Sequence, residues 1–180
     1  MRHGGSGSSA RKPLYTVAER ARRDATRWTL VQGLLAPVQF LVFLVSLVLV
    51  LRFLATGEGE GAATVSIIVK TLTLYTIMVT GAIWEKVVFG QYLFAPAFFW
   101  EDAVSMIVIA LHTLYLWGLL TGGLSVREQM LLALVAYATY VANAAQFVWK
   151  LRMARLDAAA GNASGAPDST FPLESGVPAR

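Results

Sequence analysis

The sequence predicts an all-α, polytopic membrane protein: a bundle of four transmembrane helices with both termini in the cytoplasm. The chain has 180 residues, of which 56% are hydrophobic and only 14% charged, whereas a soluble domain carries about 25% charged residues. Four stretches are long and apolar enough to cross a hydrocarbon core, which needs about 20 helical residues. Lys and Arg residues gather before the first stretch and after the last, and such residues mark the cytoplasmic side.

The four predicted spans cover approximately residues 30–54, 65–89, 103–120 and 129–149. The first, LVQGLLAPVQFLVFLVSLVLVLRFL, follows an Arg-rich segment and is too long for a cleaved signal peptide. The connections ATGEGEGAAT and TGGLSVRE are short and Gly-rich, as expected of loops on the outer side. The segment 85–102 is then the only cytoplasmic connection between spans.

Both ends of the chain differ in composition from the membrane domain, which we place at residues 14–156. Residues 1–13 and 157–180 are rich in Gly, Ser, Ala and Pro, so we expect disordered tails. Between the first tail and the membrane, TVAERARRDATRW is typical of a short basic helix with Thr16 as N-cap and Glu19 completing a capping box. Its charge favours attraction to anionic lipid over binding of nucleic acid.

Several classes of chemistry have no support in this sequence. The chain has no cysteine, which excludes disulfides, thiolate zinc sites, iron–sulfur clusters and thiol nucleophiles. It also lacks P-loop, GxGxxG and HExxH motifs. His112 is the one histidine within the spans, so a bis-histidine haem does not fit one chain. We therefore expect no resident metal and no cofactor.

Polar residues in the spans are predicted to converge near the cytoplasmic side of the bundle. Embedded ionisable groups are costly and indicate function by default, although amides also serve as hydrogen bonds between helices. His112 lies about 16 Å deeper than Glu101 at 1.5 Å per residue, and Lys70, near the outer side, is expected to snorkel outward. The converging set is Glu85, Glu101, Asp102, Asn143, Gln146, Gln32 and Gln39.

Three stretches carry a family resemblance: ERARRDATRWTLVQGLLAPVQFLVFLVSLVLVLRFLATGEG, VKTLTLYTIMVTGAIWEKVVFGQYLFAPAFFWEDAVSM and YATYVANAAQFVWKLRMARL. They closely resemble the 3-vinyl bacteriochlorophyllide hydratase family of photosynthetic bacteria, over about residues 14–156. The resemblance implies hydration of the C3 vinyl group of chlorophyllide a, or of a related bacteriochlorophyllide, to 1-hydroxyethyl during bacteriochlorophyll synthesis. It also implies a bacterial inner membrane, with magnesium present only in the substrate macrocycle.

Protonation of a conjugated vinyl group followed by addition of water needs a general acid, an acceptor for the proton of water and a pocket for a flat ring. We expect Glu101 or Glu85 to be the acid, with the other carboxylate or Asp102 orienting the water. In the alternative, Lys86 pairs with Glu101 or Asp102 and holds them ionised.

The remaining candidates concern the macrocycle. We expect Trp84, Phe99 and Trp100 to pack against it, although an ordinary aromatic belt at the membrane surface is the simpler explanation of these rings. His112, Gln146, Asn143 or a water is a candidate axial ligand of the substrate magnesium.

Two other functions compete with a hydratase. One is a non-enzymatic tetrapyrrole carrier or photosynthetic assembly protein, and the other is a small transporter, which the absence of inverted repeats disfavours. The expected partners are the lipid bilayer, the pigment and neighbouring enzymes of the pathway.

Overall fold

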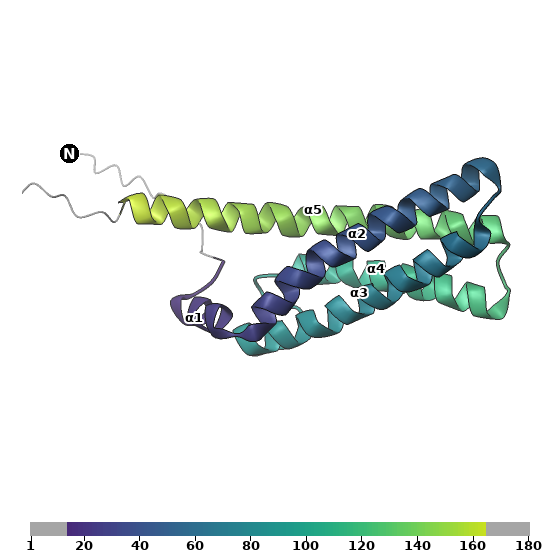
Figure 1. Cartoon of the computed structure of the whole chain (residues 1–180). Coiled ribbons are helices and arrows are strands. Elements are labelled where there is room, and N and C mark those ends of the chain that lie inside the picture. The colour runs from purple at the N-terminus through teal and green to yellow at the C-terminus, as the bar shows by residue number, and fades with distance from the viewer. Residues whose placement is uncertain (1–13, 165–180) are drawn as a thin grey trace, which may run out of the picture.

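The structure, a computed structural model, describes residues 14–164, with side chains described up to Leu156. This part of the chain forms five α-helices and contains no strand (Figure 1), which confirms the all-α prediction. Their bounds are α1 Val17–Ala25, α2 Arg27–Thr56, α3 Glu60–Phe89, α4 Phe99–Thr121 and α5 Val126–Ser164.

Four of these helices are long and apolar enough to cross a membrane, namely α2, α3, α4 and the Val126–Leu156 part of α5. Their surfaces expose large apolar side chains such as Leu41, Val48 and Leu120, as a lipid-facing surface requires. The four predicted spans are thus confirmed; each helix begins a few residues earlier than predicted, and α5 continues well past residue 149. The chain is a multi-pass membrane protein.

The helix ends follow capping chemistry. Thr16 and Glu19 form the predicted capping box on α1: the Glu19 N–H donates to Thr16 Oγ1 at 3.3 Å, and the Thr16 N–H donates to Glu19 Oε2 at 2.7 Å. Gly57 and Gly90 end α2 and α3 with φ of 75° and 88°, a left-handed conformation that glycine adopts without steric cost. The turns that reverse the chain are therefore encoded locally.

One boundary differs from the prediction. The helix α5 continues to Ser164, past residue 157, where a disordered tail was expected to begin. Alanines at positions 158–160 favour continued helix. The rest of that tail, 165–180, and the other predicted tail, 1–13, lie outside the described residues.

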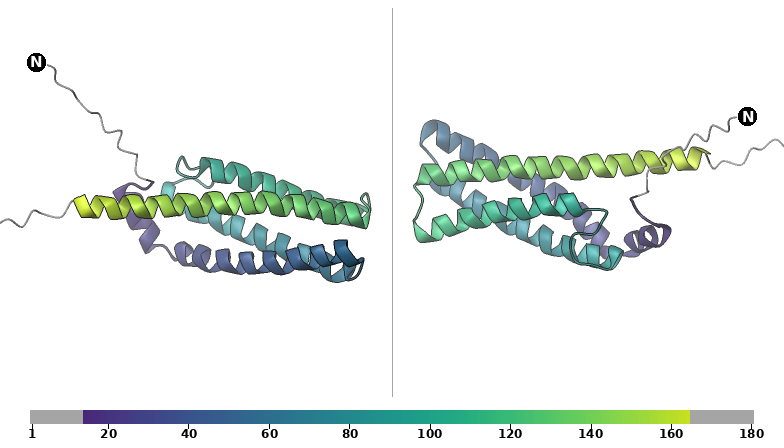
Figure 2. Two further views of the ribbon diagram at one scale, coloured as in Figure 1. Left: turned by 90° about the horizontal axis from the view of Figure 1, so that it is seen from above. Right: turned by 180° about the vertical axis from the view of Figure 1, so that it is seen from behind.

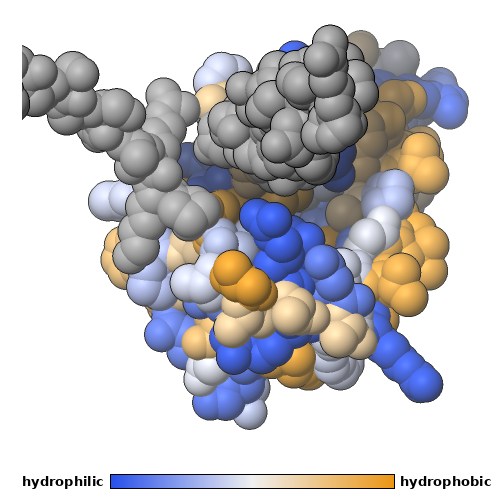
Figure 3. All heavy atoms as spheres, turned by 90° about the vertical axis from the view of Figure 1, so that its left-hand side faces the viewer, coloured by the Kyte–Doolittle hydropathy of each residue, from blue (hydrophilic) through white to orange (hydrophobic). Residues whose placement is uncertain are grey.

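The four long helices pack as two hairpins. The helix α2 packs mainly on α3 and α4 mainly on α5, with fewer contacts between the hairpins, and α1 packs on α3 (Figures 1 and 2). The α1 end of the bundle also holds the 90–98 loop, whereas the opposite end holds the 57–59 and 122–125 connections. Viewed from the α1 end, hydrophilic residues gather over α1 and its surroundings (Figure 3). This end offers the polar surface beside which a site could be built.

Candidate functional site

Two carboxyl groups from different helices meet near the α1 end. Glu85 lies in the last turns of α3 and Asp102 in the first turn of α4; their exposed fractions are 6% and 3%. The charge of Asp102 acts on Glu85, so the two side chains lie close together. Two carboxylates in one buried site repel each other, which favours a proton on one of them. Such a pair can give one proton and receive another.

The 90–98 loop holds both members of this pair through its backbone. The Phe94 N–H donates to Asp102 Oδ2 at 2.7 Å, and the next amide, from Ala95, donates to Glu85 Oε2 at 3.3 Å. Phe94 has a φ of 58°, and it is the single non-glycine residue with positive φ among the described residues. Residues other than glycine pay a steric cost there, and strain of this kind clusters at functional sites.

The third predicted carboxylate has a partner of its own. Glu101 accepts from Lys150 Nζ at 2.5 Å across α4 and α5. The alternative in which Lys86 pairs with Glu101 or Asp102 is wrong: Lys86 Nζ donates to the Gly90 carbonyl at 2.7 Å. A lysine therefore does hold one carboxylate, but it comes from α5 rather than α3.

A shallow surface pocket of about 520 Å³, open over most of its extent, lies along α5 beside the Glu101–Lys150 pair. Ligand pockets are typically about 300–1,000 Å³ and mostly apolar, with a few polar groups that fix orientation. Asp102 is close enough to Glu101 and Lys150 for their charges to act on it, so the carboxyl pair lies near this pocket. The lining residues are Glu101, Ala142, Ala145, Gln146, Trp149, Lys150 and Met153.

The three predicted aromatic contacts divide between interior and surface. The Trp84 indole N–H donates to Thr29 Oγ1 at 3.0 Å, and the ring packs at 5.8 Å from both Phe89 and Phe98. Phe99 and Trp100 have exposed fractions of 46% and 72%. None of the three rings lines the pocket.

The aromatic cluster around Trp84 includes the segment before α1. Tyr15 stacks on Phe89 at 5.8 Å and approaches Phe98 at 6.4 Å. Burial raises the pKa of the Tyr15 phenol, against the opposite effect of the nearby Arg23 charge. This cluster fixes α1 and the end of α3, on which Glu85 lies.

The predicted amide side chains lie in the half of the bundle nearest α1, and two of them bond hydroxyl groups of neighbouring helices rather than the carboxyl groups. Asn143 Nδ2 donates to Ser105 Oγ at 2.7 Å, which joins α5 to α4, and Gln32 Nε2 donates to Thr80 Oγ1 at 2.8 Å, which joins α2 to α3. Gln39 is buried, and Gln146 lines the pocket.

Two basic residues of the core behave differently from the carboxyl groups. His112 is 1% exposed and its Nδ1 lies 2.8 Å from the Val108 carbonyl, so the structure does not bring it to the carboxyl pair. The expectation that Lys70 snorkels outward is wrong, because its side chain is 0% exposed and its Nζ lies 3.5 Å from the ring centroid of Tyr140. The aromatic face attracts the ammonium group.

Sequence reasoning did not anticipate the loop amides of Phe94 and Ala95 or the pairing of Lys150. Lys150 shares a helix face with Asn143 and Gln146 by spacing, and that signal was available. Backbone donors leave no trace in residue types, so the loop contacts had no comparable signal.

Comparisons with known proteins agree with one another. A family model described as 2-vinyl bacteriochlorophyllide hydratase matches residues 15–153. A protein of that name from Rhodobacter capsulatus is 73% identical over 154 residues, which covers 86% of this chain and 90% of the relative. Another, from Cereibacter sphaeroides, is 72% identical over 155 residues, covering 84% and 94%. No solved structure matches the chain.

Proposed function

The chain belongs to the 2-vinyl bacteriochlorophyllide hydratase family, and from this premise we propose that Glu85 and Asp102 are the acid–base pair that hydrates the vinyl group. The resemblance seen in the sequence is thereby confirmed, as is a hydro-lyase activity in bacteriochlorophyll biosynthesis. The 2-vinyl group of the family name is the vinyl group on the ring carbon that is called C3 above. The observation that carries the proposal is the placement of the two buried carboxyl groups on consecutive loop amides, Phe94 N–H to Asp102 and Ala95 N–H to Glu85.

The reaction follows from a pair that holds a single proton. The protonated member of the pair gives its proton to the terminal vinyl carbon, and the positive charge left on the inner carbon is delocalised by the macrocycle. Water then adds to the inner carbon and loses a proton to the carboxylate member. The pair then holds one proton again, and transfer of that proton between the two adjacent carboxyl groups restores the original acid. General acid–base catalysis of this kind contributes about 10²- to 10⁴-fold.

The loop amides give this pair its geometry. Phe94 and Ala95 each occupy one oxygen of a carboxyl group, which leaves the other oxygen for the partner carboxyl and for the reacting atoms. A fixed orientation of this kind reduces the entropy lost on reaching the transition state.

The pocket beside Asp102 supports a place for the macrocycle. Trp149 and Met153 offer an apolar wall, and Glu101 with Lys150 forms its polar edge. In this arrangement Glu101 orients the pigment or the water as an ionised acceptor rather than acting as the acid. Gln146 also lines the pocket, so it is the candidate axial ligand of the substrate magnesium that fits this placement, whereas Asn143 and His112 are buried inside the bundle and do not line the pocket.

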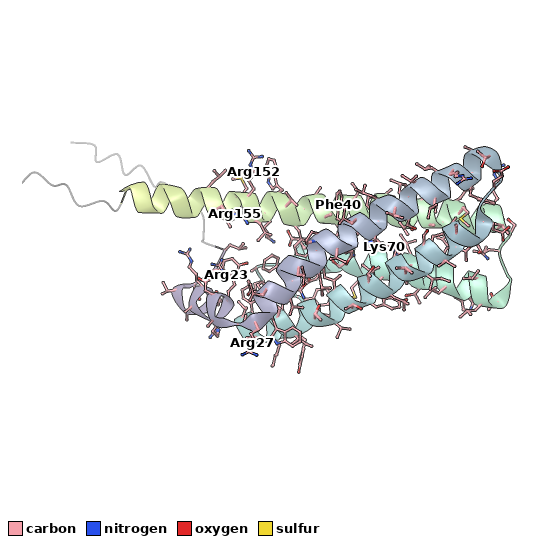
Figure 4. The ribbon with its side chains drawn as sticks, in the orientation of Figure 1. Arg23, Arg27, Phe40, Lys70, Arg152 and Arg155 are labelled. Carbon is pink, nitrogen blue, oxygen red and sulfur yellow. The ribbon has the colours of Figure 1, made fainter. Side chains whose placement is uncertain are left out.

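The remaining proposals concern the cofactor requirement of the enzyme, its orientation in the membrane and its partner enzymes. Addition of water changes no net oxidation state, so we propose that the enzyme works without a cofactor. Arg23, Arg27, Arg152 and Arg155 all lie at the α1 end (Figure 4), which supports a cytoplasmic orientation of that end and of the site in the bacterial inner membrane. A site there would receive pigment from, and release it to, enzymes at the same membrane surface.

The experiment is incubation of membranes containing this protein with chlorophyllide a, followed by mass and absorption analysis. The expected product is heavier by one water, and its red absorption band is shifted to the blue because vinyl conjugation is lost. Tight pigment binding without added water, for chlorophyllide a and a bacteriochlorin alike, would contradict the proposal and favour a carrier.

A further inference from the structure

A second polar cluster lies in the core of the bundle, and all four membrane helices contribute to it. Ser46 from α2, Lys70 from α3, His112 from α4 and Tyr137 from α5 are fully or almost fully buried, and Figure 4 labels Lys70 within the length of the bundle, away from the arginines of the α1 end. Lys70 precedes Glu85 on α3 by a helix length of about 22 Å at 1.5 Å per residue. The cluster is therefore separate from the carboxyl pair.

Hydrogen-bond directions in the hydroxyl chain can be assigned one after another. Ser66 Oγ donates to the Ala63 carbonyl at 2.7 Å, which uses its only proton. Ser46 Oγ, 2.7 Å away, must then donate to Ser66, and Tyr137 Oη, 2.5 Å from Ser46 Oγ, must donate to Ser46. The Tyr137 oxygen is left with a free acceptor position in the core.

The imidazole of His112 supplies another acceptor. Its Nδ1 lies 2.8 Å from the Val108 carbonyl, and a carbonyl only accepts, so Nδ1 carries the proton. In the neutral ring Nε2 then has a lone pair, and this buried atom has no hydrogen-bond partner among the described residues. The ring lies 5.9 Å from that of Tyr137, which places both acceptors in one neighbourhood.

Lys70 supplies donors to the same neighbourhood. Its Nζ is buried without a hydrogen-bond acceptor in the described part of the chain, and it lies 3.5 Å from the ring centroid of Tyr140 and 5.9 Å from that of Phe43. The Phe43 ring also contacts Tyr137 at 5.4 Å. Lys70 and His112 are close enough to interact electrostatically.

We propose that Lys70, His112 and Tyr137 bind one ordered water molecule in the core of the bundle. The water accepts from Lys70 Nζ and donates to His112 Nε2 and Tyr137 Oη, which makes the three hydrogen bonds typical of a buried water. A simple anion such as chloride would satisfy Lys70 but has no proton to donate to the two acceptors. Through the water and the hydroxyl chain, α2, α3, α4 and α5 are joined at one level. This inference does not depend on the proposed function.

Infrared spectroscopy of the purified full chain, compared in H₂¹⁶O and H₂¹⁸O, tests the site directly. We expect a narrow O–H stretching band, distinct from bulk water, that shifts on ¹⁸O substitution and is lost in Lys70→Met. Thr71→Val is the matched control, because the Thr71 hydroxyl is buried beside Lys70 in sequence but donates to its own helix at Ile67. Thr71→Val should keep the band.

A second measurement tests the site without Lys70→Met, and so remains available where that variant does not fold. In a His3→Gln chain His112 is the only histidine, and solid-state NMR with ¹⁵N-histidine can report proton transfer from bound water to its ring. Such transfer, with Nδ1 protonated and Nε2 accepting, is the expected result. A missing infrared band in the wild type, a band that survives in a folded Lys70→Met, or a halide-dependent shift without water transfer would overturn the proposal.

Discussion

The carboxyl pair and the core cluster are both built from buried ionisable groups on α3 and α4, yet their surroundings differ. Glu85 and Asp102 lie where α3 ends and α4 begins, so the irregular backbone of the 90–98 loop supplies amide donors to each, and a pocket lies nearby. Lys70 and His112 lie within continuous helices whose amides are already bonded, and they are sealed from the surface. Burial of charge therefore indicates a reaction site only where the chain also leaves access for a substrate.

The largest expected effect is at the carboxyl pair. Glu85→Gln and Asp102→Asn each keep the side-chain shape but remove the proton exchange, so we expect the rate of hydration to fall by about 10²- to 10⁴-fold. Pigment binding, measured by absorption titration, should remain. A loss of less than tenfold in both folded variants would place the acid elsewhere.

A smaller effect is expected where the loop meets this pair. Phe94→Gly keeps the N–H donor and adopts positive φ without cost, so it should retain most of the hydration rate. Phe94→Val keeps the donor but is β-branched and opposes that conformation, so the loop should shift and the rate should fall by at least tenfold. The comparison of initial rates in the two variants isolates backbone geometry from the loss of the ring. Equal rates would show that the left-handed conformation does not position the carboxyl groups.

At Glu101 the expected effect is smaller again. Glu101→Gln removes the ion pair with Lys150 but keeps a side-chain oxygen that can accept a hydrogen bond from it. We expect the hydration rate to fall by less than tenfold, with the change mainly in KM for the pigment. A loss as large as that of Glu85→Gln would make Glu101 the acid instead.

The core cluster should affect stability rather than reaction rate. Ser46→Ala and Tyr137→Phe each interrupt the hydroxyl chain, and interhelical hydrogen bonds in membranes are worth about 0.6–2 kcal/mol. Thermal unfolding followed by circular dichroism should show each single variant destabilised by about 1 kcal/mol. The double variant should lose less than the sum, because the two residues share one bond; additive losses would argue against that bond.

Much of the fold follows from local chemistry in the sequence. Apolar length identified the four spans, and the pattern from Thr16 to Glu19 predicted the cap of α1. The order of the spans also placed Glu85 and Asp102 at the same end of the bundle, because Glu85 lies near the end of one span and Asp102 at the start of the next. These features depend on periodicity and on residue types, which a sequence displays directly.

The errors concern contacts between helices. Lys70 was expected at the surface because a long side chain can snorkel, but the ring of Tyr140, far away in sequence, attracts its ammonium group inside the bundle. Likewise, Lys86 was the alternative partner for Glu101 or Asp102, yet Lys150 from α5 pairs with Glu101. Helix rotation and the rings on facing helices decide such pairings, and a single sequence does not show them.

The amount of hydrated pigment formed in a single turnover by the Glu85→Gln/Asp102→Asn double variant, measured by mass beside Glu101→Gln and the wild type, tests the acid–base pair most directly. We expect bound but unhydrated chlorophyllide a in the double variant, and a product heavier by one water in the other two. Hydration by the double variant at the wild-type rate would contradict the assignment of Glu85 and Asp102 as the acid–base pair.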